Sequence, residues 1–331
     1  MNHATKPLRV HLAACTGSAQ ESPAILAWRQ MADKDVFEVH SLTDDPSRAD
    51  LILFVDLHLS PDWRLRTLLN HELLHRFRHK VLVYDERDRP WCTLPGLYVS
   101  MPARHFEARW QRPCAYYGAA KFTEAERNGT APDLLYSFVG SRSHAIRKPI
   151  LRLTHLRAVV EDSSGFVFYD RSDPEAFDRR KAHFRTTLLR SKFVLCPRGA
   201  GTSSIRLFET LAAGRVPVII GDQWVPPVGP KWEDFSLRVR ESETATIPHL
   251  LEAAETQFPR MAQAAYAAHA KWFSEPVIFH RLITECAALL DQAFSSHRPQ
   301  KGLCYLSRGI HEAGHRFRGS VGRLLQASGL R

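Results

Sequence analysis

Short apolar runs alternate with segments of helical spacing along most of this chain. Apolar runs such as residues 50–55 and 216–220 are bounded by turn-forming or charged residues, as buried strands are. Between them, segments such as 24–32 and 174–190 repeat apolar positions every three or four residues, which is typical of amphipathic helices. Strand and helix patterns that alternate in this way predict an α/β protein with mainly parallel sheets.

The same pattern divides the chain into two α/β units, separated by a breaker-rich segment at 123–133 that is typical of a linker. We therefore expect an N-terminal Rossmann-like domain over residues 1–130, a second one over residues 131–296, and a basic tail over residues 297–331. The expected strands are 8–14, 37–42, 50–55, 80–84, 134–139, 166–169, 193–196 and 216–220. The expected helices are 24–32, 62–78, 144–155, 174–190, 203–213, 246–257, 260–273 and 276–294.

Composition places the chain among folded globular proteins, because 44% of its 331 residues are apolar and 24% are charged. The net charge of +10 favours polyanionic partners such as nucleotide phosphates, a membrane surface or nucleic acid, although a generally basic surface would also explain it. The six cysteines include no C-x-x-C pair, so we expect buried free thiols in a reducing compartment. The sequence contains neither a signal-like N-terminal region nor a run of about 18 apolar residues. We therefore expect a cytoplasmic protein, with peripheral contact to the inner membrane face as an option.

The strongest chemical signal lies between Ser191 and Asp222, where a strand, a small flexible turn, a helix and a second strand follow one another. The turn, residues 198–202, has glycines where the backbone must bend or let a ligand approach closely. Ser203 or Ser204 could cap the helix that follows. Unpaired N–H groups and the positive end of the helix dipole would then face the space beyond the strand, which predicts an anion site. A purely structural turn is the alternative.

Two charged residues of that helix, Arg206 and Glu209, lie three positions apart and therefore on one face. A guanidinium beside a diphosphate offsets the charge that builds on a leaving nucleotide without a metal. A carboxylate one turn further on can accept both hydroxyl groups of a ribose. An ordinary intrahelical ion pair uses the same spacing, so it is the combination with the glycine turn that favours nucleotide binding.

The C-terminal half resembles the signature of exostosin-type glycosyltransferases. Its motifs are a strand ending in C-P-R-G, a hydroxyl-rich turn, R-x-x-E at 206–209, A-G-x-x-P-V-I-I at 213–220 and W-x-x-F at 232–235. Residues 136–147 (YSFVGSRSHAIR) resemble the strand and glycine turn that open the donor-binding domain of this family. The best-matching portion runs from Tyr136 to Glu241.

This resemblance implies a GT-B fold, in which two Rossmann-like domains face each other across a cleft and C-terminal helices complete the structure. It implies an inverting, metal-independent transfer of a sugar from a nucleoside diphosphate, with UDP favoured, to a glycan or lipid-linked glycan in surface polysaccharide synthesis. No cofactor, metal or nucleic-acid partner is expected. Arg206 would contact the diphosphate and Glu209 the ribose. The other residues expected around the donor are Arg198, Gly199, Gly201, Thr202, Ser203 and Ser204 at the pyrophosphate, and Gly140, Ser141, Arg142 and Arg147 at the cleft.

An inverting transfer also needs a base that takes the proton of the acceptor hydroxyl. Asp85, Glu86 and Asp88 follow the predicted strand 80–84, and loops after strands commonly carry functional side chains. Glu86 and Asp85 are the leading candidates, and Asp56, at the end of another predicted strand, comes next. An ordinary solvated turn would explain the same carboxylates.

One competing motif is H-E-L-L-H at residues 71–75, which matches the H-E-x-x-H pattern of zinc proteases. Arg76 and the strand that follows almost at once leave little room for a third ligand, so a polar helix face is favoured. Two alternative functions stay open: a non-catalytic nucleotide- or nucleic-acid-binding protein and, from residues 71–75 alone, a zinc metalloprotease. The basic tail has apolar residues at a roughly helical period, and would pack on the N-terminal domain or on an anionic membrane surface.

Overall fold

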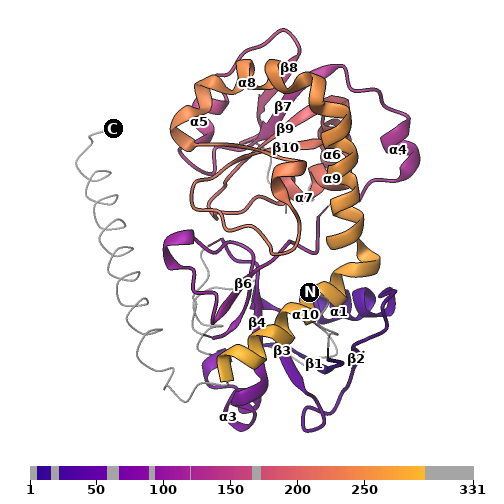
Figure 1. Cartoon of the computed structure of the whole chain (residues 1–331), viewed down its shortest axis with the longest axis vertical. Helices are drawn as coiled ribbons and strands as arrows, with labels where there is room; N and C mark the ends of the chain where they lie inside the picture. The colour runs from indigo at the N-terminus through magenta and orange to yellow at the C-terminus, as the bar shows by residue number, and fades with distance from the viewer. Residues whose placement is uncertain are drawn as a thin grey trace, which may run out of the picture.

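The computed structural model describes residues 6–15, 22–57, 67–88, 94–119, 121–165 and 173–294. It shows two α/β domains stacked along the long axis of the molecule (Figure 1). The predicted strand 166–169 and the basic tail 297–331 lie outside the described residues.

The N-terminal domain is built on a six-stranded parallel sheet with the strand order β2-β1-β3-β4-β5-β6. The strands are β1 (Arg9–Ala13), β2 (Ser41–Leu42), β3 (Leu51–Phe54), β4 (Val81–Asp85), β5 (Gly96–Tyr98) and β6 (Gln111–Pro113). The helices are α1 (Pro23–Asp33) and α3 (Glu72–Arg76), with 3₁₀ turns η2 (Arg78–Lys80) and η3 (Ala103–His105). Every residue of β3 and β4 is buried, as expected for central strands of a parallel sheet that is covered on both faces.

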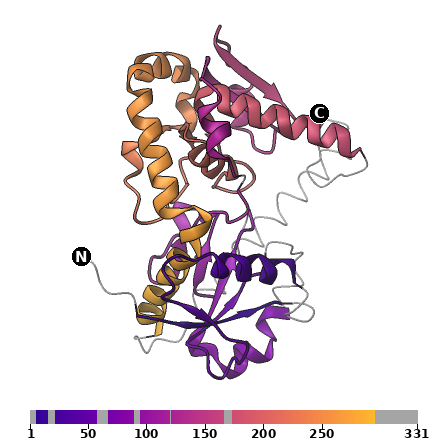
Figure 2. The same cartoon turned by 90° about the vertical axis from the view of Figure 1, so that its right-hand side faces the viewer.

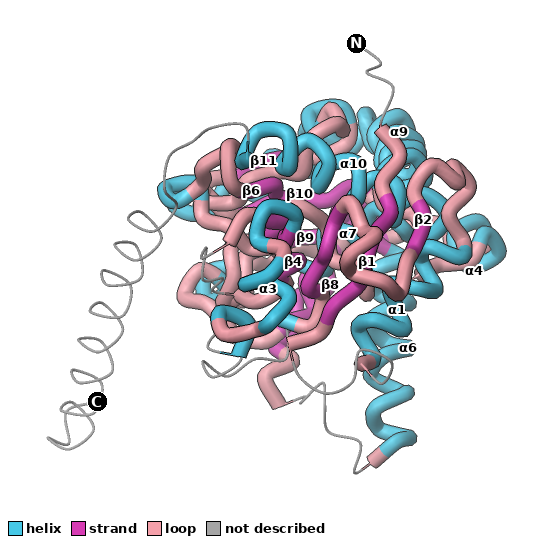
Figure 3. The backbone as a smooth tube through the Cα atoms, turned by 90° about the horizontal axis from the view of Figure 1, so that it is seen from below, coloured by secondary structure: helices cyan, strands magenta, loops and turns pink. Residues whose placement is uncertain are grey.

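The second domain carries a five-stranded parallel sheet with the order β11-β10-β9-β7-β8. Its strands are β7 (Leu134–Gly140), β8 (Ala158–Asp162), β9 (Ser191–Pro197), β10 (Val216–Ile220) and β11 (Leu237–Val239). Its helices are α5 (Arg147–Ile150), α6 (Pro174–Arg190), α7 (Ile205–Ala212), α8 (Ile247–Ala254) and α9 (Phe258–Trp272), with 3₁₀ turns η4 (Trp232–Asp234), η5 (Glu241–Thr246) and η6 (Glu255–Gln257). Figures 2 and 3 show α6 reaching outward from this domain, whereas other helices cover the strands.

The final helix, α10 (Glu275–Phe294), crosses back and packs on the N-terminal domain (Figure 1). Its apolar side chains, among them Ile278 and Phe279, share one core cluster with residues of β1 and α1, including Val10 and Trp28. From its position in the sequence we placed this helix in the second domain, but by packing it belongs with the first. A parallel sheet needs apolar cover on both faces, and α10 supplies part of that cover. Two facing Rossmann-like domains with C-terminal helices are the GT-B arrangement, which confirms the expected fold class.

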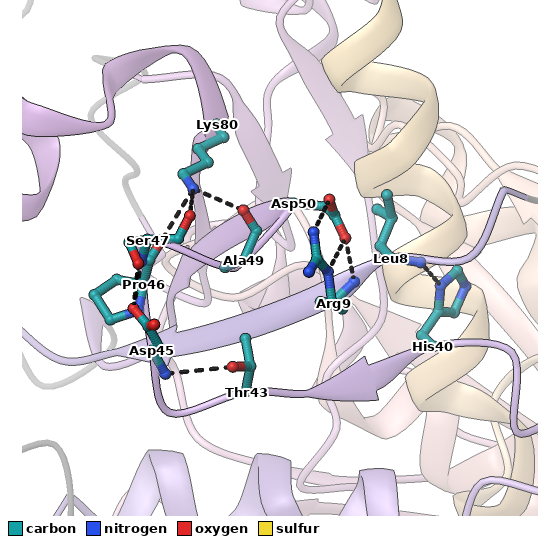
Figure 4. Close-up of polar contacts among 10 residues, drawn as sticks. All are labelled: Leu8, Arg9, His40, Thr43, Asp45, Pro46, Ser47, Ala49, Asp50 and Lys80. Carbon is teal, nitrogen blue, oxygen red and sulfur yellow. Dashed lines mark hydrogen bonds and ion pairs between the residues drawn. The ribbon is translucent and has the colours of Figure 1, made fainter.

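Polar contacts hold the amino ends of the N-terminal strands together (Figure 4). The buried Lys80, just before β4, donates Nζ to the carbonyl oxygens of Pro46 at 2.9 Å and Ala49 at 2.7 Å. Arg9 at the start of β1 forms two hydrogen bonds of 3.0 Å with the carboxylate of Asp50, just before β3. These contacts stabilise the end of the sheet opposite to its carboxyl edge, and leave that edge for other side chains.

The strands that the apolar pattern does not predict are either very short or only partly buried. β5, β6 and β11 have three residues each, too few to show a period. In β5, a Cβ on Gly96 would lie 2.2 Å from the carbonyl oxygen of Val83, so close pairing with β4 requires glycine where the sequence suggests a turn. β8 also goes unpredicted, because its residues are only partly buried.

Other differences concern length. The predicted helix 144–155 contains only the short α5, and the predicted strand 37–42 contains only β2. The predicted linker 123–133 includes helix α4 (Glu124–Asn128), because Thr123 and Glu126 form a capping box that satisfies its first N–H groups. By contrast, α6 and β10 coincide residue for residue with the predicted 174–190 and 216–220.

Candidate functional site

A pocket of about 260 Å³ lies where residues that follow the carboxyl ends of strands in the two sheets meet. Open α/β sheets bind their ligands at this edge. The N-terminal domain contributes Asp88, which follows β4, and Tyr116, which follows β6. The residues lining it from the second domain are Ser143, Arg147, Gly199, Ala200, Ser203, Ser204, Ile205, Arg206 and Glu209.

The glycine turn after β9 is pressed against the N-terminal domain. A Cβ on Gly201 would lie 2.5 Å from Ser100 Oγ and 2.6 Å from Asp88 Oδ1, so a larger residue there would require the side chains of Ser100 and Asp88 to move. The Arg198 side chain folds back over this turn and donates to the carbonyl oxygens of Gly199 at 3.4 Å and Ala200 at 3.3 Å. The structure therefore gives Arg198 a role in shaping the turn, and it does not line the pocket.

The Arg206 side chain is fixed by contacts with strand β7 and also lines the pocket. Its Nη2 donates to the carbonyl oxygen of Val139 at 2.5 Å, and its guanidinium lies 4.8 Å from the centre of the Phe138 ring. Gly140 makes room for it, since a Cβ there would lie 2.9 Å from Arg206 Nη2. The buried Nε of Arg206 has no hydrogen-bond partner among the described residues. Burial lowers the pKa of Arg206, and the nearby Cys196 and Glu209 offset only part of this effect.

Arg147 links the turns that follow two neighbouring strands. The buried guanidinium donates to the carbonyl oxygens of Arg198 at 2.9 Å, Ser141 at 3.1 Å and Pro197 at 3.2 Å. Burial and the like charge of Arg206 lower the pKa of Arg147 to about 10, so it stays charged at neutral pH. Ser141 contributes only its carbonyl to this link.

The amino end of α7 offers donors without a side-chain cap. Ser204 occupies the N-cap position but makes no capping hydrogen bond, so the prediction that Ser203 or Ser204 caps this helix is wrong. The hydroxyl groups of Thr202 and Ser203 are buried and have no partner within the described part of the chain. Buried polar groups in folded proteins are normally satisfied. These hydroxyls and the uncapped N–H groups fit an anion such as a diphosphate.

Arg142, the remaining residue predicted at the donor, faces elsewhere. Its Nε pairs with Asp162 Oδ2 at 2.6 Å at the end of β8, and its backbone N–H donates to Ser164 Oγ at 3.0 Å. The structure does not bring Arg142 into the pocket. Glu209, in contrast, lies on the pocket-lining face of α7 with Arg206, as the spacing predicts.

The three carboxylates predicted as the base are held away from the pocket lining. Asp85 is fully buried and accepts from Arg87 Nη2 at 2.6 Å and Nε at 2.9 Å. Glu86 accepts from the Tyr84 hydroxyl at 2.5 Å, and burial raises the pKa of Glu86. The buried Asp56 accepts from the backbone N–H of Cys15 at 2.8 Å.

Asp88 and Tyr116 reach the pocket instead, although neither is among the residues predicted for the site. Asp88 stands in the same acidic loop as Asp85 and Glu86, so its position after β4 was a usable signal. Nothing in the sequence marks Tyr116, because it lies in an irregular segment whose path depends on how the domains pack.

The H-E-L-L-H motif has a structural explanation. His71 is the N-cap residue of the five-residue helix α3, and its Nδ1 accepts from the backbone N–H of Leu73 at 3.2 Å. The histidine ring also packs edge-on against Phe54, with ring centres 5.0 Å apart. Among the described residues, no three His, Cys, Asp or Glu side chains gather in a group that could hold a metal ion.

Known proteins resemble the second domain in sequence. Residues 119–254 match the family described as Exostosin GT47 domain. An exostosin-1 homolog from Caenorhabditis elegans is 37% identical over 81 residues, which are 24% of this chain and 21% of the relative. A probable glucuronoxylan glucuronosyltransferase from Arabidopsis thaliana is 40% identical over 76 residues, 22% of this chain and 17% of the relative. The chain thus spans about a fifth of the length of these relatives.

Two solved structures align with most of the chain at low identity. A glycosyltransferase from Rickettsia africae covers 87% of this chain and 99% of its own, with a TM-score of 0.42 and 8% identity. Anabaena Alr3699/HepE, solved in complex with UDP, covers 87% of this chain and 100% of its own, with a TM-score of 0.39 and 9% identity. The match of residues 119–254 to the Exostosin GT47 domain confirms the resemblance to exostosin-type glycosyltransferases.

Proposed function

We propose that the protein is a glycosyltransferase that moves a sugar from a nucleoside diphosphate, UDP in the first instance, to a hydroxyl group of a glycan or lipid-linked glycan. One observation carries the proposal. Arg206, Glu209 and the uncapped amino end of α7, all within the region that matches the Exostosin GT47 domain, line one pocket together with residues of the N-terminal domain. Anion donors, a ribose-binding carboxylate and an opposite wall for the acceptor then lie within one cavity.

The diphosphate would lie at the amino end of α7. Arg206 offers a buried Nε, and Thr202 and Ser203 offer hydroxyl groups that no other described residue engages. Charge-assisted hydrogen bonds of this kind offset the negative charge that grows on the leaving nucleoside diphosphate. We therefore propose transfer without a metal, with Arg206 and the helix dipole in the place that a cation takes in other enzymes.

Glu209 would bind the ribose one helical turn further along α7. The two sides of the pocket also suit an inverting transfer, because the acceptor would enter from the N-terminal domain, opposite the leaving group. The net charge of +10 suits anionic substrates and an anionic membrane surface. Of the helices in the described ranges, none combines the length and apolarity needed to span a bilayer. We propose a role in surface polysaccharide synthesis on the cytoplasmic side of the membrane.

The proposal is tested first by nucleotide binding. Full-length protein is heated with UDP, GDP, CMP or dTDP, and one nucleotide at a hundred times its Kd should stabilise the folded state by about 2.7 kcal/mol. The matching nucleotide-sugars are then incubated with the protein, and the released nucleotide is measured (UDP, GDP or dTDP, and CMP from the CMP-sugar). Binding followed by release supports a transferase. Binding without release from any sugar nucleotide would favour a non-catalytic nucleotide-binding protein, and no binding would contradict the proposal.

A further inference from the structure

Among the described residues of the N-terminal domain, Asp88 is the carboxylate that lines the pocket. It is exposed, whereas Asp85 is fully buried three residues earlier. Its Oδ1 lies 2.6 Å from the position that a Cβ on Gly201 would occupy, so the carboxylate contacts the donor turn from the opposite domain. Asp88 therefore stands at the boundary between the acceptor side and the donor side.

The effects of Asp88 on the pKa values of neighbouring groups agree with this position. Its charge raises the pKa of Arg147, against the larger lowering effect of burial. It also raises the pKa of the Tyr116 hydroxyl, which burial has already raised. Because the charge of Asp88 affects both Arg147 and Tyr116, which line opposite sides of the pocket, its carboxylate lies in the pocket between them.

The neighbouring carboxylates already have partners that a base would have to give up. Arg87 binds both oxygens of Asp85, and the Tyr84 hydroxyl and the Tyr117 backbone N–H donate to Glu86. A general base needs a free lone pair within hydrogen-bond reach of the proton it takes. No hydrogen bond or ion pair with another described residue engages the Asp88 carboxylate.

We propose that Asp88 is the general base of the transfer, an inference that rests on the proposed glycosyltransferase function. The acceptor hydroxyl oxygen attacks the anomeric carbon and forms the new C–O bond. The bond between that carbon and the β-phosphate oxygen breaks, and its electron pair leaves with the nucleoside diphosphate. The hydroxyl proton passes to an Asp88 carboxylate oxygen, so charge and atoms balance.

The test uses water as acceptor, so that the natural acceptor need not be known. Wild-type protein, Asp88→Asn and the matched control Asp178→Asn are incubated with UDP-glucose, UDP-galactose, UDP-glucuronic acid and UDP-N-acetylglucosamine, and released UDP is measured. Asp178 is exposed on the outward-reaching helix α6 and lies outside the pocket. We expect Asp88→Asn to lower kcat/KM by about 10²–10⁴-fold, as loss of general-base catalysis does, with UDP affinity close to wild type. The control should match wild type.

Azide separates a base from a residue that merely shapes the site. Azide is already an anion and needs no proton removed, so it should restore UDP release by Asp88→Asn and yield a glycosyl azide of inverted configuration. It should not restore Arg206→Ala, whose defect lies at the leaving group. Asp88→Asn activity within about threefold of wild type, equal losses of UDP affinity and turnover, or no azide rescue would each overturn the role of Asp88. Wild-type protein that releases nucleotide neither from these UDP-sugars nor from the other nucleotide-sugars of the screen would instead contradict the proposed function itself.

Discussion

The two sides of the pocket are built in different ways. On the donor side, Arg147 donates to the carbonyl oxygen of Arg198 in the turn after β9, and Arg206 donates to that of Val139 in β7, so the groups that line the pocket also stabilise its walls. On the N-terminal side, Asp85 is bound by Arg87 and Glu86 by the Tyr84 hydroxyl, so neither carboxylate lines the pocket. The pocket is lined instead by Asp88 and Tyr116, which come from separate segments. The proposed diphosphate site therefore depends mainly on one short contiguous segment, whereas the proposed acceptor side depends on tertiary packing.

The largest effect should come from the donor side. We expect Arg206→Ala and Glu209→Ala each to lower nucleoside diphosphate release by about 10²–10³-fold or more, because each removes a charged contact to the nucleotide. Arg179→Ala and Glu175→Ala are matched controls, since this exposed pair on α6 lies outside the pocket. Steady-state kinetics and thermal unfolding check the result. Full activity in both variants, with the fold intact, would contradict the proposal that Arg206 and Glu209 bind the nucleotide.

Stability should change most on the N-terminal side. Arg87→Met leaves the carboxylate of Asp85 buried without its ion-pair partner, and we expect a loss of about 3–5 kcal/mol in the free energy of unfolding. The double variant Arg87→Met with Asp85→Asn should recover part of that loss, as urea denaturation would show. A variant that lost turnover but not stability would mean that Asp85 takes part in the chemistry.

The contact between the two sides is tested at Gly201. A Cβ there overlaps Ser100 and Asp88, so we expect Gly201→Ala to cost about 1–3 kcal/mol of stability and to lower turnover by displacing the acceptor wall. Gly165→Ala is the control, because a Cβ at Gly165 meets no atom of the described residues within 4 Å. Equal behaviour of the two variants would show that the domains do not meet at this turn.

A further effect is a pH response that arises in the N-terminal domain. Burial and the neighbouring His280 lower the pKa of His40 to about 4, below its unfolded value of about 6.5. As the pH falls through that window the unfolded chain takes up a proton that the folded chain refuses, so stability decreases by about 1.4 kcal/mol per pH unit. Denaturation of His40→Gln should show a weaker fall. An unchanged slope would assign the response to other groups.

The sequence predicts several elements of the second domain, and the shared face of Arg206 and Glu209, well because these features are local. Helix α6, strand β10, the glycine turn and the Arg206–Glu209 spacing each depend on residues within one or two turns of chain. The same local logic failed for the cap of α7, whose serine hydroxyls make no capping bond. It also could not tell which carboxylate of the acidic loop reaches the pocket, because Arg87 and Tyr84 hold two of them only once the chain is folded.

Long-range packing accounts for the rest. Tyr116 reaches the pocket through an irregular segment, and strands β5 and β6 are too short to carry a pattern. Helix α10 packs on the N-terminal domain because that domain offers an apolar surface to it. No sequence motif near residue 275 indicates this packing.

A crystal structure of the full chain with UDP tests the central claim most directly. We expect the diphosphate within hydrogen-bond distance of Arg206 and the amino end of α7, and the ribose hydroxyls at Glu209. Nucleotide bound elsewhere on the molecule, or bound in this pocket with its ribose away from Glu209, would contradict the account.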